Sequence, residues 1–228
     1  MKKRILLALS VLALGGNPVP ALSADADPQF KRMTAPGQLT VKSIDEQDLD
    51  PAIKDKVREQ VRLMKEHKVI PVSDHRVPDF SAMEADHRSR GKPFDKLKAD
   101  KKLKFSPANL EATTLKGQTM AGALPAGIFA NDSWSGLSRM FHHPGLRYVI
   151  LEETDLAKTG GGATFTKEMI NADVNGVPAI LLSKQGGPKK SESSLMWFSD
   201  GVLYLLRTPG VNDKAREELL DIAKSISK

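Results

Sequence analysis

Apolar and polar positions alternate most clearly in the last third of the chain, where three short apolar runs follow one another. These runs are Val177–Ser183, Ser194–Ser199 and Val202–Thr208. Asp200-Gly201 joins the last two runs, and both residues of such a pair adopt at little cost the positive φ angles of a type I′ hairpin turn. This part of the sequence therefore predicts an antiparallel meander of strands.

Further strands are expected between residue 106 and this meander. Asn175-Gly176 is a second pair of hairpin-turn residues and lies directly before Val177. Four more runs have β-compatible residues bounded by turn residues: Leu110–Leu115, Trp134–His142, Arg147–Glu152 and Thr164–Ala172. The expected fold class is α+β, with an antiparallel β-sheet of about six to seven strands.

The chain ends in a segment with the spacing of an amphipathic helix. Asn212 or Asp213 is the expected N-cap. Four apolar residues then recur three or four positions apart: Leu219, Ile222, Ala223 and Ile226. Because such a stripe needs an apolar surface to cover, we expect this C-terminal helix to pack across one face of the sheet.

The residues before 106 show a different pattern, with one amphipathic helix in a largely polar stretch. Asp50-Pro51 supplies an N-cap followed by proline at the first helical position, and apolar residues with helical spacing predict a helix over 51–67. From Ser73 to Lys104 the chain is polar and interrupted by proline and glycine, which predicts a long, partly disordered connection with one short helix near 94–103.

The chain therefore divides into three expected parts. Residues 1–24 are a signal peptide, residues 25–105 are a basic, flexible and partly helical arm and linker, and residues 106–228 are the sheet-plus-helix domain. The signal peptide is recognised from Lys2, Lys3 and Arg4 followed by an apolar run that ends near Leu14. That run is shorter than the roughly 20 residues of a spanning helix. We expect cleavage between Ser23 and Ala26 and a soluble, periplasmic mature protein without a transmembrane segment.

The net charge is less informative than it first looks. The whole chain carries +6, but removal of its first three basic residues leaves +3. Six lysines and two aspartates give the stretch Lys92–Lys104 a local charge of +4. We expect at most a weak contact of this stretch with an anionic surface, and a solvated face is the commoner use of such a run. The run is not accompanied by a nucleic-acid-binding fold, and the expected export argues further against nucleic acid as a partner.

Catalytic, metal and cofactor sites are not expected. The chain has no cysteine, so a disulfide and a thiol nucleophile are both excluded. His142 and His143 are adjacent on an expected strand and point to opposite faces, and the histidines lack the spacing of a zinc-binding helix. Ser133, Ser135 and Ser138 lie near His142 only in sequence, and no nucleophile elbow is present.

Three residues of one expected strand are the candidates for ligand binding: Trp134, Arg139 and His142. Trp134 lies in the polar, turn-rich sequence NDSWSG, where an indole forms the rim of a ligand groove or covers the end of the sheet. Both roles stay open for Trp134. Trp197, between Met196 and Phe198, is expected in the core.

The carboxy-terminal phrases INADVNGVPAILL, LMWFSDGVLYLL and REELLDIAKSI suggest a family relationship. Residues 165–228 resemble the extracytoplasmic sheet-plus-helix domains of bacterial envelope regulators associated with anti-sigma factors. This resemblance implies a noncatalytic sensory or protein-binding role. The membrane anchor and cytoplasmic domain of such regulators are absent from this chain, which argues against direct control of a sigma factor.

Three functions remain open from the sequence. The first is a periplasmic binding, sensory or accessory protein without catalytic activity, whose partner is an envelope protein or peptide. The second is a carrier that holds a lipid or acylated polypeptide in the concave face of the sheet, for which the ordinary aliphatic and aromatic content gives no special support. The third is a hydrolase of unknown substrate.

Overall fold

A computed structural model describes most of the chain after residue 35. The described residues are 36–92, 103, 105–130, 132–188 and 190–226, with the backbone of Leu9–Ser10. The expected signal peptide 1–24, its cleavage site and the expected helix near 94–103 lie outside these residues, apart from Leu9–Ser10 and Leu103.

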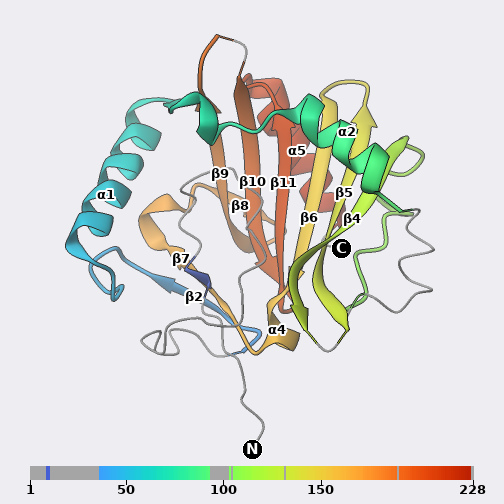
Figure 1. Cartoon of the computed structure of the whole chain (residues 1–228). Coiled ribbons are helices and arrows are strands. Elements are labelled where there is room, and N and C mark those ends of the chain that lie inside the picture. The colour runs from blue at the N-terminus through green and yellow to red at the C-terminus, as the bar shows by residue number, and fades with distance from the viewer. Residues whose placement is uncertain are drawn as a thin grey trace, which may run out of the picture.

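A large eight-stranded sheet forms the centre of the molecule (Figure 1). Its strands follow in the order β3-β9-β10-β11-β6-β5-β4, and β8 pairs with β9. Neighbouring strands are antiparallel, except that β3 runs parallel to β9. The strand bounds are β3 Ile70–Pro71, β4 Met120–Ala130, β5 Ser133–His143, β6 Arg147–Asp155, β8 Ala172–Val174, β9 Val177–Gln185, β10 Ser191–Ser199 and β11 Val202–Pro209. The expected α+β class with a C-terminal helix on an antiparallel sheet is confirmed.

Both expected hairpin turns are present. Asn175 and Gly176 have φ angles of 53° and 86° between β8 and β9, and Asp200 and Gly201 have φ angles of 51° and 81° between β10 and β11. Positive φ at both central positions is the requirement of the type I′ turn. These turns fix the register, so that Trp197 lies opposite Tyr204.

Helix α5 (Asp213–Ile226) covers one face of the large sheet, which we call the α5 face. The Asn212 side chain accepts a hydrogen bond from the Ala215 amide at 2.8 Å and so caps the start of α5. The expected stripe of α5 faces the sheet, since Leu219, Ile222 and Ala223 are buried and Ile226 packs partly against the same cluster. On the sheet side this core contains Trp197, stacked on Tyr204 with ring centroids 4.8 Å apart.

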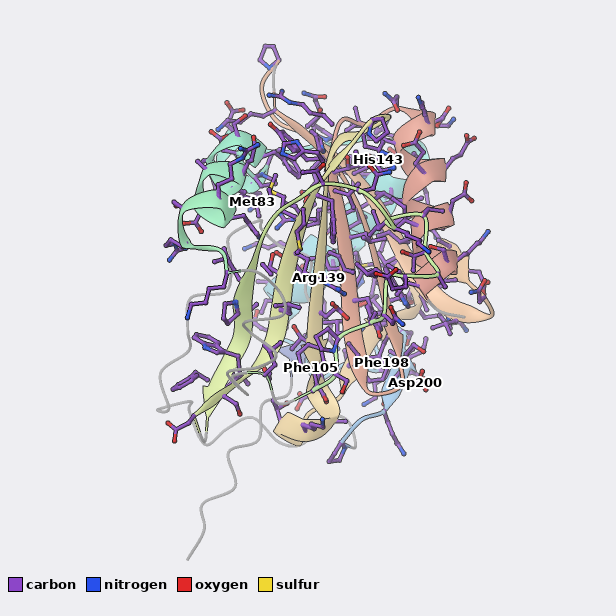
Figure 2. The ribbon with its side chains drawn as sticks, turned by 90° about the vertical axis from the view of Figure 1, so that its right-hand side faces the viewer. Met83, Phe105, Arg139, His143, Phe198 and Asp200 are labelled. Atoms are coloured by element: carbon purple, nitrogen blue, oxygen red, sulfur yellow. The ribbon has the colours of Figure 1, made fainter. Side chains whose placement is uncertain are left out.

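The opposite face carries α1 (Pro51–Glu66), α2 (Phe80–Arg90) and a small parallel sheet in the order β1-β7-β2. We call it the α1–α2 face; Figure 1 views the molecule from this side, and Figure 2 shows α2 and α5 on opposite sides of the large sheet. The small sheet consists of β1 Leu9–Ser10, β2 Leu39–Lys42 and β7 Ala163–Thr166. Three short helices connect the larger elements. η1 (Asp74–Arg76) precedes α2, α4 (Leu156–Thr159) lies between β6 and β7, and η2 (Lys167–Met169) lies between β7 and β8.

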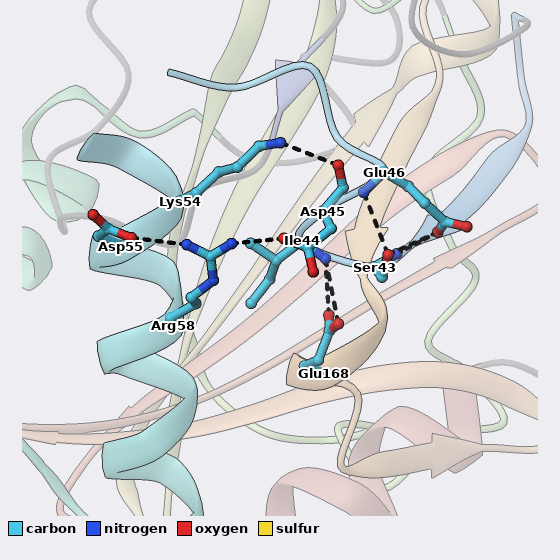
Figure 3. Close-up of polar contacts among 8 residues, drawn as sticks. All are labelled: Ser43, Ile44, Asp45, Glu46, Lys54, Asp55, Arg58 and Glu168. Carbon is cyan, nitrogen blue, oxygen red and sulfur yellow. Dashed lines mark hydrogen bonds and ion pairs between the residues drawn. The ribbon is translucent and has the colours of Figure 1, made fainter. Parts of the chain in front are cut away.

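The turn after β2 joins α1 to the small sheet (Figure 3). Arg58 of α1 pairs with Asp45 at 2.6 Å, and Lys54 donates to the Asp45 carbonyl oxygen at 3.1 Å. The Ile44 amide donates to the carboxylate of Glu168 in η2 at 3.2 Å. Because Ile44 is also buried with Val57 and Val61 of α1, this turn holds the helix against the strands.

Some segments differ from the sequence-based expectations. The helix expected over 51–67 is present as α1, but the polar stretch from Ser73 contains helix α2, which the sequence did not predict. Leu110–Leu115 forms turns rather than a strand, and β4 arises instead from a run rich in glycine and alanine. The single strand expected over Thr164–Ala172 is divided by η2 into β7 and β8, which belong to different sheets.

Candidate binding surface

A row of four charged side chains crosses four strands on the α1–α2 face. Lys184 of β9, Glu192 of β10, Arg207 of β11 and Glu152 of β6 alternate in sign. Arg207 Nε donates to Glu192 Oε1 at 2.6 Å, and longer ion pairs join Lys184 to Glu192 at 3.9 Å and Arg207 to Glu152 at 3.8 Å. Only Glu152 among the four is appreciably open to solvent, with 28% of its side chain exposed.

Burial and charge act differently on the two cations of this row. Burial lowers the pKa of the Lys184 ammonium; the charge of Glu192 opposes this shift, and Arg207 and Arg76 add to it. For Arg207, burial also opposes the charged form, but the charges of Glu192 and Glu152 outweigh it and leave the pKa raised. The Glu192–Arg207 pair is therefore the main contact within the row. Lys184 is the cation of the row whose charged form is destabilised.

Helix α2 lies across β4 and β5 at one end of the same face. The Tyr148 hydroxyl donates to Glu84 of α2 at 2.5 Å. His142 Nε2 lies 3.2 Å from Glu84 Oε1 and 3.0 Å from Arg88 Nη2. The hydrogen bond from Tyr148 is the main cause that lowers the pKa of the Glu84 carboxyl. Beneath these polar contacts, Phe80 packs with Met140, so α2 is attached by a polar rim around an apolar patch.

A buried histidine and a close backbone approach fix the other end of α2. His87 Nδ1 lies 2.8 Å from the Met83 carbonyl oxygen, which can only accept, so this nitrogen donates. His87 Nε2 forms a hydrogen bond with the Ser138 hydroxyl at 3.0 Å. A Cβ on Gly122 of β4 would lie 2.1 Å from the His87 carbonyl oxygen, so only glycine allows this approach.

This histidine–serine pair is a poor catalytic centre. His87 and Ser138 are 3% and 7% exposed, so substrate has no access to the serine oxygen. The group that orients the imidazole is a backbone carbonyl, whereas hydrolytic triads use a carboxylate for this purpose. Ser135 is fully buried, and its hydroxyl accepts a hydrogen bond from the Ile128 amide at 2.9 Å. These serines therefore have structural contacts.

Arg139 lies on the α5 face and forms a buried ion pair there. Its Nη2 atom donates to Glu153 at 2.6 Å and to the Ala108 carbonyl oxygen at 3.1 Å, while the Ala108 amide donates to Glu153 at 2.7 Å. Burial raises the pKa of the Glu153 carboxyl, although Arg139 and these hydrogen bonds oppose that shift. The pair fastens the turn-forming segment at Ala108 to the sheet; Figure 2 labels Arg139 near the middle of the strands.

Trp134 lies at the far end of the β4–β5 hairpin, opposite Phe129. The two rings are tilted at 49° with centroids 5.2 Å apart, and 53% of Phe129 is exposed. Leu103 forms a parallel bridge with Trp134. Among the described residues, Phe129 and Val41 are the exposed large hydrophobic side chains, and Phe129 is the more exposed.

The structure does not bring the three sequence-predicted ligand-binding residues together. Trp134 lies at a hairpin end, Arg139 is buried on the α5 face, and His142 contacts α2 on the α1–α2 face. His142 and His143 point to opposite faces as expected, since His143 lies 3.4 Å from Glu218 of α5. The charged row was missed because its residues are distant in sequence; the β9–β10 hairpin register, which places Lys184 opposite Glu192, is the signal that could have found part of it.

Two hollows between these elements are small. One of about 240 Å³ lies between Phe80 at the start of α2, Tyr148 and Pro209. Another of about 70 Å³ lies between Met64 of α1 and Arg216 of α5. Enclosed ligand sites typically measure about 300 to 1,000 Å³, so both fall below that range.

Within the described ranges, no three histidine, aspartate or glutamate side chains gather as metal ligands would, and none of the helices has the length and apolar character that a membrane crossing requires. The basic stretch Lys92–Lys104 lies outside these ranges except for Lys92 and Leu103. No family model, curated protein or solved structure matches this chain.

Proposed function

We propose that this chain is an exported, periplasmic protein without catalytic activity that binds a polypeptide of the cell envelope. The observation that carries the proposal is the Phe129–Trp134 pair at the end of the β4–β5 hairpin. Aromatic side chains are enriched where proteins bind one another. The Phe129 ring is 53% exposed, and a partner that covers it would remove this apolar surface from water, which favours binding. In this role Trp134 forms the edge of the contact surface and Phe129 its centre.

A binding role is also supported by the state of the polar groups. Three buried polar pairs on the two faces of the sheet contact each other: Glu192–Arg207, Glu153–Arg139 and His87–Ser138. A hydrolase needs such groups directed at substrate. The small volumes of these two hollows give the carrier alternative no support, since a lipid chain needs an enclosed apolar cavity.

The sensory or accessory part of the proposal comes from sequence. The resemblance of residues 165–228 to domains of envelope regulators supports a protein-binding role, and the basic start with its short apolar run supports export. Amino-terminal sequencing of periplasmic protein should find a start between Ala24 and Asp27. Retention of Met1 would contradict export.

Site-specific photo-crosslinking in the producing cell tests the binding role directly. A photoreactive amino acid in place of Phe129 should give one dominant adduct with a polypeptide. The same amino acid in place of Lys224, which is exposed on α5, is the matched control and should give none. The variant Trp134→Ala, with the photoreactive group kept at residue 129, should reduce the yield of that adduct.

Other outcomes of this experiment are equally informative. A lipid adduct at residue 129 would favour the carrier. Equal labelling at residues 129 and 224, or no labelling at either, would refute a specific contact at the hairpin end.

A further inference from the structure

Strand β7 lies in the middle of the small sheet and uses both of its edges. β2 pairs with one edge in parallel, from Leu39 opposite Ala163 to Lys42 opposite Thr166. β1 pairs with the other edge, also in parallel, with Leu9 opposite Ala163 and Ser10 opposite Thr164. The Ala163 amide donates to the Gln38 carbonyl oxygen at 3.0 Å, on the β2 side.

Successive residues of a strand direct their backbone groups to opposite edges. Because Ala163 faces β2, the N–H and C=O groups of Thr164 face β1, and those of Thr166 face the same way. The side chains along this strand are largely buried, with Ala163 at 0%, Phe165 at 1% and Thr164 at 7% exposure. The β1 edge of β7 is thus a template for one more parallel strand, set beside a filled apolar core.

The strand that occupies this edge comes from a segment that the mature protein lacks if it is exported. Leu9–Ser10 lie inside the apolar run of the expected signal peptide 1–24. Cleavage between Ser23 and Ala26 removes β1 and leaves β2 in place. The mature chain then has an open edge on β7, and the exposed N–H and C=O groups of such an edge can pair with a further strand.

We propose that the β1 edge of β7 is a peptide-binding site, which accepts an extended, apolar segment of a partner polypeptide as a parallel third strand. Strand addition of this kind takes its affinity from main-chain hydrogen bonds and its selectivity from alternate side chains. The strand that pairs with this edge in the structure, Leu9–Ser10, belongs to an uncharged run of aliphatic and small residues. We expect the partner segment to have the same character. This inference rests on the proposed removal of residues 1–24 and names the kind of polypeptide that is bound.

The test uses the chain that starts at Ala24, with the full chain of 228 residues for comparison. The probe is a synthetic peptide with the sequence of residues 2–14, which carries its own three basic residues for solubility. Hydrogen exchange should show the amide of Thr164 protected in the full chain, exposed in the shortened chain, and protected again when the peptide is added.

Two proline variants of the peptide make the test specific for a parallel strand in this register. When Ser10 lies opposite Thr164, the N–H of the next peptide residue, Val11, donates to the Thr164 carbonyl oxygen, while the N–H of Ser10 points away from β7. Val11→Pro removes that donor and should weaken binding about tenfold, whereas Ser10→Pro should weaken it much less.

Each outcome decides for or against the site. Equal effects of the two proline variants, or protection that appears away from β7, would overturn the proposal. Loss of amide protection in β9, β10 and β11 of the shortened chain would also overturn it, because β1 would then be an integral strand of the fold. Peptide binding at β7 without any crosslink at Phe129 would leave this site standing and refute the hairpin contact of the proposed function.

Discussion

Truncation of Leu219 in α5 is a direct test of how the C-terminal helix is held. Leu219 has no exposed surface and lies in one cluster with Trp197 and Leu195 of β10. The strands below it are fixed by hydrogen bonds to their neighbours and cannot move in to fill a cavity. We therefore expect Leu219→Ala to cost about 3 to 5 kcal/mol, near the upper end for a buried leucine. This is a large part of a typical stability of about 5 to 15 kcal/mol.

Urea denaturation followed by tryptophan fluorescence measures this loss, because Trp197 is fully buried in the same cluster. Leu220→Ala is the matched control: it removes the same atoms from the next residue, which is only partly buried, and should cost about 1 kcal/mol. Lys224→Ala, at an exposed position, should change the midpoint very little. Equal midpoints for the two leucine variants would refute the packing of α5 described here.

Three further variants test the polar contacts. Tyr148→Phe removes the hydroxyl that binds Glu84 and should speed amide exchange in α2 about threefold to tenfold while leaving α5 unchanged, as measured by hydrogen exchange. Arg139→Met leaves Glu153 buried without its cation and should cost about 3 to 5 kcal/mol in urea denaturation, and a second change, Glu153→Gln, should recover much of that loss. Burial lowers the pKa of Lys184, so just below the ordinary lysine pKa of 10.5 the folded chain binds fewer protons than the unfolded chain, and the contribution of this group to stability rises with pH. Lys184→Met should flatten the stability profile in that range, and an unchanged slope would contradict the shift.

The sequence contains clear signals for the parts of the fold that local chemistry decides. Asn175-Gly176 and Asp200-Gly201 specify their turns because positive φ is needed at both central positions. The stripe of α5 around Leu219 has one face to bury, and the structure buries it. These features depend on residues close together in the chain, so they can be recognised before the fold is known.

Helix α2 and the charged row depend instead on contacts between distant residues. α2 has no apolar stripe and is held by Tyr148 and Ser138, which lie far along the chain. From the sequence, Arg207 and Glu192 would be predicted to be exposed to solvent. The strand pairing of the sheet places them side by side and buried. The expected ligand-binding residues lie apart for a related reason: Arg139 and His142 are close in sequence, but three steps along a strand place them on opposite faces.

The position of β11 in the sheet has a consequence for how the chain folds. β11 lies between β10 and β6, so the two halves of the sheet cannot be joined until nearly the whole chain has been synthesised. Contacts such as that of Ile44 with Glu168, 124 positions away, add to the non-local character of the fold. Chains dominated by such contacts fold slowly, and this one has no disulfide to shorten the search. We expect the nascent chain to stay unfolded during its synthesis, which suits the proposed export, because an unfolded chain is the form that passes through an export channel.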